Sequence, residues 1–235
     1  MVKKKPLIYI LHGWSPRQST LKMWKPFLKL LDDAGYQSKY LKIPGLSQEL
    51  NETWDMSNYL DWLEVKLNDK KDLILLGHSF GARLWINFCS RNSNNVKKLI
   101  LIDAGGIRDQ SIKSQIKRKT FWLAAKIGKK IFKGDFFRKL LYKLARERDY
   151  LEAPPGLRKT LSNVLSKDVT PLLDKVKCKT LIIWGKNDRV TPISNAYTMN
   201  KMIKNSQLKL IEEGRHSPQF THPEKVFKLV DKFLT

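Results

Sequence analysis

The feature that most restricts the fold of this 235-residue chain is a serine between two glycines at the end of an apolar run. Residues 73–76 read Leu-Ile-Leu-Leu, and residues 77–81 read Gly-His-Ser-Phe-Gly. A buried strand that passes through Gly-x-Ser-x-Gly into a helix makes a tight turn, which lifts the serine hydroxyl above the edge of a sheet. Glycine suits both flanking positions because a side chain there would collide with neighbouring backbone. The pattern predicts a nucleophile, Ser79, between a strand and a helix.

Apolar runs typical of strands alternate with amphipathic segments typical of helices. The runs cover residues 7–11, 36–43, 73–76, 98–102, 180–184 and 208–211. Helical patterns cover about residues 24–34 and 57–68, with Ser57 as the expected N-cap, and a last helix begins at Pro223. This alternation predicts an α/β fold with a mostly parallel sheet and helices on both of its faces.

One connection is much longer than a crossover between parallel strands needs, because residues 104–179 separate the fourth run from the fifth. Helical patterns recur within it at about 112–131, 137–144 and 157–165. We therefore expect residues 1–105 and 169–235 to form the core, and residues 106–168 to form a helical lid inserted into it.

The chain is strongly basic, with 45 Lys and Arg against 22 Asp and Glu, a formal net charge of +23. The expected lid holds 17 basic and 6 acidic residues, a net charge of +11. A solvated surface explains such a charge, and a docking surface for an acidic protein or an anionic membrane is the alternative. No nucleic-acid-binding module accompanies the charge, so we do not expect nucleic acid to be the primary partner.

Other compositional features predict a cytoplasmic protein without a cofactor. The two cysteines, Cys89 and Cys178, are far apart and form no disulfide framework. No apolar stretch approaches the roughly 18 residues of a membrane span, and the apolar part of the N-terminus is too short for a signal peptide. The sequence also lacks the spacing of a metal-ligand cluster and a phosphate-binding glycine loop. We expect neither a metal nor a cofactor.

A serine hydroxyl needs a base to accept its proton, and the chain has four histidines. His12 and His78 belong to the motifs at two strand ends, and His222 precedes the last helix, so we expect structural roles for these three. His216 follows the last apolar run, where a loop at the carboxyl edge of the sheet can bring an imidazole over the serine. We predict that His216 is the general base and acid.

The imidazole in turn needs a carboxylate that fixes its tautomer and stabilises its charged form. Asp188 follows the fifth apolar run and is the predicted acid. Asp103, which ends the fourth run, is the alternative, although a cap of the turn at residues 105–106 explains it better. The backbone N–H groups of Phe80 and Trp14 are the predicted oxyanion hole, and both residues are predicted to contact the substrate.

Four motifs carry a resemblance to a known family. They are His-Gly-Trp at 12–14, Gly-His-Ser-Phe-Gly at 77–81, Trp-Gly-Lys-Asn-Asp at 184–188, and Gly-Arg-His-Ser-Pro at 214–218 followed by His-Pro at 222–223. Over essentially its whole length the chain resembles α/β-hydrolase-fold serine hydrolases with a helical lid, whose triad follows the order serine, acid, histidine. In detail it is similar to small carboxylesterases of the pimeloyl-acyl-carrier-protein methyl ester esterase type. The family's two leading strands are absent, so the resemblance implies about six strands.

The function implied is hydrolysis of carboxylic esters of small to medium acyl groups. Two alternatives stay open, namely a carbon–carbon bond hydrolase or acyltransferase on the same triad, and a ligand receptor with little turnover. If the resemblance to the esterases holds, the basic lid could recruit an acidic acyl-carrier protein. The lid residues proposed for that contact are Lys117, Arg118, Lys129, Lys130, Arg138 and Lys139.

Overall fold

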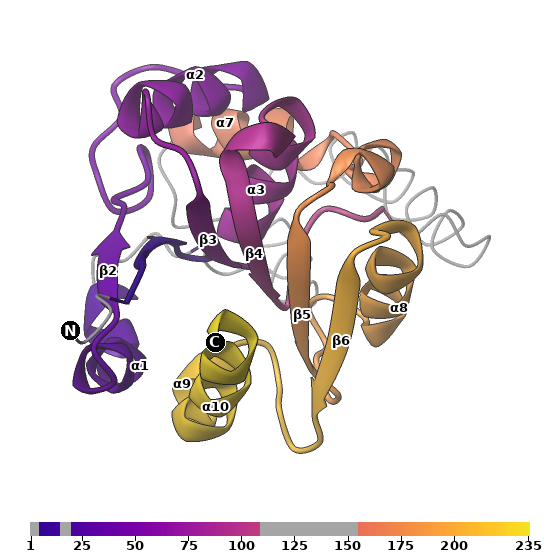
Figure 1. Cartoon of the computed structure of the whole chain (residues 1–235). Helices are drawn as coiled ribbons and strands as arrows, with labels where there is room; N and C mark the ends of the chain where they lie inside the picture. Colours follow the sequence, from indigo (N-terminus) through magenta and orange to yellow (C-terminus); the bar gives the residue numbers. More distant parts are fainter. Residues whose placement is uncertain (1–4, 15–19, 109–154) are drawn as a thin grey trace.

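The computed structural model describes residues 5–14, 20–108 and 155–235, and their core is a six-stranded sheet (Figure 1). All neighbouring strands are parallel, in the order β2-β1-β3-β4-β5-β6. The strands are β1 (Leu7–Leu11), β2 (Gln37–Tyr40), β3 (Leu73–His78), β4 (Val96–Ile102), β5 (Lys179–Gly185) and β6 (Ser206–Ile211). The predicted parallel sheet of about six strands is confirmed.

Helices cover both faces of the sheet, because successive strand residues point to opposite sides. On one face, Ile8, Ile74 and Ile100 belong to an apolar layer with side chains of α1 (Thr20–Asp33) and α10 (Pro223–Leu234). On the other face, Tyr9 and Leu75 pack in a layer that includes side chains of three helices. These helices are α2 (Met56–Leu67), α3 (Phe80–Arg91) and α8 (Ile193–Met202). The remaining short elements are η1 (Ser93–Asn95), η2 (Thr170–Lys175) and α9 (Pro218–Thr221).

The start of α2 differs from the prediction, because its N-cap is Asp55 and not Ser57. The Asp55 carboxylate accepts hydrogen bonds from the N–H groups of Ser57 and Asn58, at 2.8 and 3.3 Å. The Asn58 side chain in turn accepts from the Asp55 N–H at 2.9 Å, which completes a capping box. A carboxylate two residues upstream therefore caps the helix in place of the serine, and the helix begins earlier than predicted.

The ends of two other elements also differ from the prediction. Helix α1 begins at Thr20, four residues before the predicted start, and contains Pro26. Strand β2 ends at Tyr40 and not at residue 43, because the Ile43 carbonyl closes a turn by accepting from the N–H groups of residues 46–48.

Helix α7 (Pro155–Leu165) lies in the range expected for the lid and packs directly on the core. Its Leu161 and Val164 side chains are buried in the same apolar layer as α2 and α3. The buried Arg83 guanidinium on α3 donates to the carbonyls of Val164 and Lys167 at 2.5 and 3.2 Å. The helices expected at 112–131 and 137–144, and the proposed basic docking residues, lie outside the described residues.

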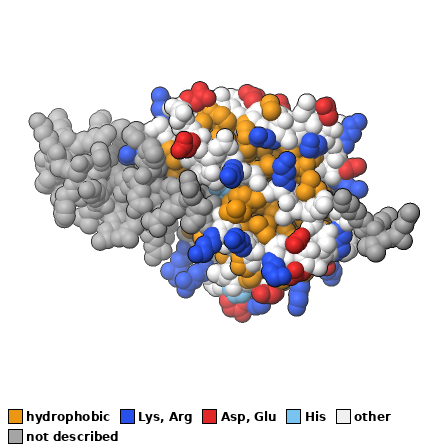
Figure 2. Space-filling view, turned by 90° about the vertical axis from the view of Figure 1, so that its left-hand side faces the viewer, with side chains coloured by type: hydrophobic (Ala, Val, Ile, Leu, Met, Phe, Trp, Pro, Cys, Tyr) orange, Lys and Arg blue, Asp and Glu red, His pale blue; other side chains and the backbone are white. Residues whose placement is uncertain are grey.

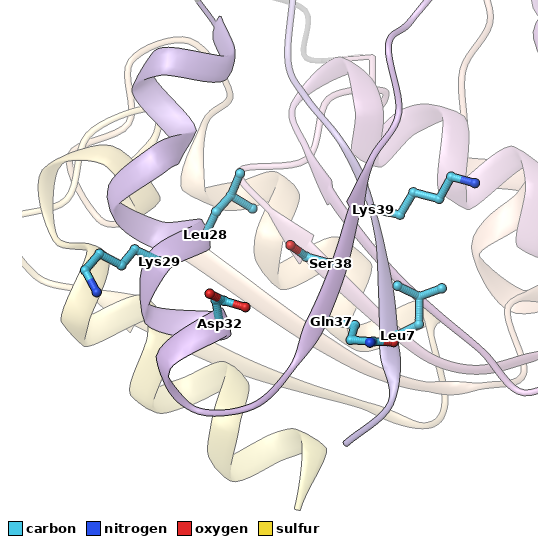
Figure 3. A pocket seen from close by; sticks show the side chains of 7 residues that line it. All are labelled: Leu7, Leu28, Lys29, Asp32, Gln37, Ser38 and Lys39. Atoms are coloured by element: carbon cyan, nitrogen blue, oxygen red, sulfur yellow. The ribbon is translucent and has the colours of Figure 1, made fainter. Parts of the chain in front are cut away.

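Among the residues that the structure describes, no helix is both long and apolar enough to cross a membrane. On the face seen in Figure 2, lysine and arginine side chains are spread among acidic and apolar ones. Figure 3 shows an open hollow between α1 and the edge of the sheet, where Leu28 and Asp32 face Ser38. Leu7 and Gln37, which begin β1 and β2, also line it, so the hollow is near the amino edge of the sheet.

Candidate active site

Ser79 occupies the sharp turn between β3 and α3, with φ 50° and ψ −109°. A side chain at Gly81 would lie 2.4 Å from the Leu11 carbonyl oxygen, and one at Gly77 would lie 2.6 Å from Ala82 Cα. Glycine at both positions therefore allows the backbone of the turn to contact its neighbours closely. The Ser79 N–H donates to the Ile102 carbonyl on β4 at 3.0 Å, which ties the turn to the adjacent strand.

The carbonyl of Ser79 is held as well, by the N–H groups of Gly105 and Arg83 at 3.0 and 3.1 Å. A non-glycine residue with positive φ is strained and persists only where its surroundings fix it. Three backbone hydrogen bonds supply that support here. The hydroxyl is therefore presented from a rigid turn at the carboxyl edge of the sheet.

His216 follows β6 and lies in the loop that leads into α9. Its Nε2 is 3.0 Å from Ser79 Oγ, and its Nδ1 is 2.8 Å from Asp188 Oδ2. In the tautomer that donates from Nδ1 to the carboxylate, Nε2 can accept the serine proton. The structure thus brings the three sequence-predicted side chains together as a continuous chain of hydrogen bonds.

Asp188 is fixed by a turn of its own after β5. Its Oδ1 accepts from the N–H groups of Val190 and Thr191, at 2.7 and 3.1 Å. The Thr191 hydroxyl donates to Oδ2 at 2.5 Å, so this oxygen is shared with His216. Burial opposes ionisation, but the hydrogen bond and charge of His216, together with the Thr191 and Val190 donors, hold the pKa of Asp188 below its ordinary value.

Asp103, the alternative acid, makes different contacts from those expected. It is fully buried, and its oxygens accept from the N–H groups of Gly185 and Ser217, each at 2.8 Å. Asp103 therefore does not cap the turn at residues 105–106 but links β4 to β5 and to the loop of His216. Burial raises the pKa of Asp103 to about 7, and the two N–H donors only partly offset that effect.

The other three histidines lie as follows. His12 is buried, with its ring nitrogens 2.7 Å from the Gly13 carbonyl and 2.7 Å from Ser47 Oγ, and burial lowers its pKa to about 4. His78 is buried against His216, with ring centroids 5.0 Å apart. His222 occupies the N-cap position of α10, where its ring contacts the Thr221 hydroxyl and makes no side-chain cap.

The two residues predicted for the oxyanion hole lie beside each other. Phe80 begins α3, where helical N–H groups have no intrahelical acceptor. Trp14 follows Gly13, at which a side chain would lie 3.2 Å from Ser79 Cβ, so this loop passes close to the serine. The Trp14 and Phe80 rings meet edge to face, with centroids 6.4 Å apart.

Sequence reasoning did not identify the parts played by Thr191, Asp103 and Ser217. Thr191 lies three residues after Asp188, close enough to suggest a turn, but the direction of its hydroxyl has no signal in the sequence. The contacts of Asp103 and Ser217 connect residues 114 positions apart, which no local pattern reports.

Within the described ranges, one group of potential metal ligands occurs, formed by His78, Asp103 and His216. Their ligand atoms lie within 4.8 Å of one another. Both Asp103 oxygens accept backbone N–H groups, His216 bonds to Ser79 and Asp188, and His78 Nε2 lies 3.1 Å from Ser217 Oγ. Hydrogen bonding explains the cluster fully, so we assign no metal to it.

Comparison with known proteins gives concordant results. The model of the α/β-hydrolase fold family matches residues 6–223. A 2-hydroxy-6-oxononadienedioate/2-hydroxy-6-oxononatrienedioate hydrolase of Escherichia coli K12 is 26% identical, in an alignment that covers 97% of this chain and 86% of that protein.

Two solved structures share the fold. A thermophilic esterase from Thermogutta terrifontis has a TM-score of 0.65 at 23% identity, over 98% of this chain and 89% of its own. A serine hydrolase involved in carbazole degradation has a TM-score of 0.69 at 18% identity, over 98% of this chain and 90% of its own.

Proposed function

This chain belongs to the α/β-hydrolase family, and from that premise we propose that it cleaves carboxylic esters of small to medium acyl groups through an acyl-enzyme. The observation that carries the proposal is the hydrogen-bonded triad, in which His216 Nε2 lies 3.0 Å from Ser79 Oγ and His216 Nδ1 lies 2.8 Å from Asp188 Oδ2. As the fold serves many functions, the proposal rests on this site and not on the family alone.

In the proposed reaction, Ser79 Oγ attacks the ester carbonyl while His216 Nε2 accepts its proton. Asp188 keeps Nδ1 protonated and stabilises the imidazolium that forms. His216 then donates the proton to the departing alcohol, which leaves an acyl group on Ser79. A water molecule, deprotonated by the same imidazole, attacks the acyl-enzyme and releases the acid.

The tetrahedral intermediates place a negative charge on the former carbonyl oxygen. We assign the N–H groups of Phe80 and Trp14 as its donors. The start of α3 favours this site further, since the free N–H groups and dipole of a helix attract negative charge there. One such donor is worth roughly 3–4 kcal/mol of transition-state stabilisation.

We further propose that residues 106–168 form a lid over this site, with α7 as the part anchored to the core. The substrate is then a small molecule held between lid and sheet edge. We also propose that the basic lid recruits an acidic acyl-carrier protein. Turnover of a carrier-linked ester should then fall with added salt, because salt screens the attraction between the two proteins.

The test is hydrolysis of p-nitrophenyl esters of increasing acyl length by the wild type and by Ser79→Ala. Loss of the nucleophile should reduce kcat by a factor on the order of 10⁶, by analogy with subtilisin. The matched control is Ser90→Ala on the same helix, whose hydroxyl donates to the Asn87 carbonyl and should be dispensable. Equal rates for the wild type and Ser79→Ala would eliminate the proposed function.

A second candidate is carbon–carbon bond hydrolysis on the same triad, favoured by the name of the Escherichia coli relative. That name describes a hydroxy-oxo dienedioate without an ester linkage, so its hydrolysis must break a carbon–carbon bond. Product analysis with a vinylogous diketone and a simple ester, offered in parallel, separates the two. Cleavage of the diketone in preference to esters of every acyl length would favour the second candidate.

A further inference from the structure

The residue that directly follows the proposed base has an unusual backbone. Ser217 has φ 97° and ψ 53°, in the left-handed region that residues other than glycine rarely adopt. Pro218 follows it and begins α9, so the chain is also constrained on its carboxyl side. A strained serine is kept in such a place only where other contacts fix it.

Two buried side chains provide those contacts. The Ser217 N–H donates to Asp103 Oδ2 at 2.8 Å, and Ser217 Oγ lies 3.1 Å from His78 Nε2. Asp103 and His78 are 0% and 5% exposed, so neither bond competes with bulk water. One residue is thus held through its backbone and its side chain, from the carboxyl ends of two different strands.

Both supports come from the part of the sheet that also carries the nucleophile. His78 is the last residue of β3 and precedes Ser79, whereas Asp103 directly follows β4. The other oxygen of Asp103 accepts the Gly185 N–H at the end of β5, just before the turn that holds Asp188. The contacts of Asp103 therefore reach the loops of both the acid and the base.

Direct action of Asp103 on the imidazole has less support. The Nδ1 atom of His216 is bonded to Asp188 Oδ2 at 2.8 Å, and both oxygens of Asp103 are engaged by backbone N–H groups. Asp103 can thus influence His216 through the backbone of the next residue.

We propose that Ser217 is a positioning residue, which Asp103 and His78 hold so that the His216 imidazole stays within hydrogen-bonding distance of Ser79. The expected loss of kcat rests on the proposed function, whereas the expected change in the position of His216 does not. A misplacement of about 1 Å in a reacting group can reduce a rate about 100-fold, so the loss of one support has a measurable effect.

The experiment compares Ser217→Ala with Ser217→Gly. Both lose the bond to His78, but glycine also relieves the left-handed strain. The matched control is Ser206→Ala, which removes a hydroxyl bonded to the Ile203 carbonyl at the start of β6, the far end of that strand from the site. Kinetics on a p-nitrophenyl ester, the pH profile of kcat and the melting temperature are measured for each variant.

If Ser217 positions the base, both variants lose kcat by about 10- to 100-fold with KM within about twofold, and the midpoint of the pH profile moves. Combining Ser217→Ala with His78→Asn should cost no more than the worse single variant, because both changes break the same bond. Ser206→Ala should retain the wild-type kcat and pH profile.

A second readout needs no turnover. The low-field NMR signal of the proton on His216 Nδ1, assigned by its loss in His216→Gln, should broaden in both Ser217 variants and persist in Ser206→Ala. An unchanged signal and unchanged kcat in both variants would overturn the positioning role. If the wild type shows no Ser79-dependent hydrolysis, the proposed function fails, and this signal alone decides the positioning role.

Discussion

At the scale of single residues, the carboxylate of Asp188 shows how one group acquires a defined charge and direction. Its Oδ2 accepts hydrogen bonds from the Thr191 hydroxyl and the His216 N–H, while two backbone N–H groups donate to Oδ1. A buried carboxylate that lacked such donors would bind a proton more readily. Thr191 is therefore part of the electrostatics of the site, although we assign it no contact with the substrate.

Thr191→Val tests this contribution, because it removes the hydroxyl and keeps the shape of the side chain. We expect kcat to fall about two- to tenfold, the value of one ordinary hydrogen bond. Since the hydroxyl helps to lower the pKa of Asp188, its loss raises that pKa, so activity on the acid side should be lost at a higher pH than in the wild type. Ser79-dependent ester hydrolysis measured from pH 4 to 8 checks both effects.

Thr191→Ser is the control, since it retains the hydroxyl. It should restore the wild-type pH profile. A valine variant whose profile matches that of the wild type would show that His216 and the backbone N–H groups maintain the charge of Asp188 without the hydroxyl.

At the scale of elements, the turn between β3 and α3 depends on close contact between backbones. Gly81→Ala would bring its Cβ to 2.4 Å from the Leu11 carbonyl oxygen and 2.6 Å from that of His12. Neither backbone atom can move as freely as a side chain, so we expect a loss of about 1–3 kcal/mol in the free energy of unfolding. Urea denaturation measures this loss.

Gly156→Ala in α7 is the matched control for that change. Among the described residues, no atom beyond its chain neighbours and the backbone of its own helix lies within 4 Å of the position its Cβ would take. Alanine favours a helix over glycine, so this variant should gain up to about 1 kcal/mol. Equal stability of the two alanine variants would contradict the account of the turn.

The contact between α3 and α7 gives another test. Burial lowers the pKa of Arg83 to about 10, which leaves its guanidinium charged at neutral pH, where it donates to the carbonyl of Val164 in α7 and to that of Lys167 just after the helix. Arg83→Met should weaken the attachment of α7 by about 1.5–3 kcal/mol, the value of hydrogen bonds from a charged group. Amide hydrogen exchange in α7 should then accelerate at least about tenfold if opening is local.

Arg91→Met provides the comparison, because Arg91 is exposed at the other end of α3. Exchange in α7 should be the same in this variant as in the wild type. If Arg83→Met also leaves the exchange rates unchanged, then the apolar contacts of Leu161 and Val164 and the hydrogen bonds to Trp54 hold the helix to the core without the guanidinium.

Elements and site residues were predictable to different degrees. Apolar runs identified all six strands, and Ser79, Asp188 and His216 could be inferred because each lies within five residues of the carboxyl end of a strand. The ends of elements were less predictable, since Asp55 replaces Ser57 as N-cap and α1 begins four residues before its predicted start. Contacts made by long-range folding, such as those of Arg83 and Asp103, have no local pattern from which to infer them.

At the scale of the whole molecule, buried ionisable groups connect stability to pH. The pKa of His12 is about 4 in the folded chain and 6.5 in an unfolded reference, so only the unfolded chain binds a proton there between these values. The stability that His12 contributes is present above pH 6.5 and is lost as the pH falls towards 4. Asp103, with its pKa raised to about 7, acts in the opposite direction, because its contribution is lost as the pH rises from 3.8 to about 7.

His12→Gln should therefore remove the part of the pH dependence of stability between pH 6.5 and 4 that is due to this imidazole, and leave the opposite contribution of Asp103. One proton corresponds to about 1.4 kcal/mol per pH unit, so the difference between variant and wild type should change by about 2 kcal/mol from pH 7 to pH 5. Urea titrations at several pH values measure the slope. His222→Gln, which removes a half-buried imidazole outside the core, is the control, and equal slopes for the wild type and His12→Gln would refute the prediction.

The long connection between β4 and β5 also has a consequence for the order in which the chain folds. Strands β1 to β4, with Ser79, lie on one side of residues 103–178, whereas β5 and β6, with Asp188 and His216, lie on the other. Pairing of β4 with β5 closes the largest loop in the sheet, and such non-local pairings form slowly. During refolding, the proposed Ser79-dependent hydrolysis should therefore return only when this ladder closes, after the secondary structure of the first four strands has already formed.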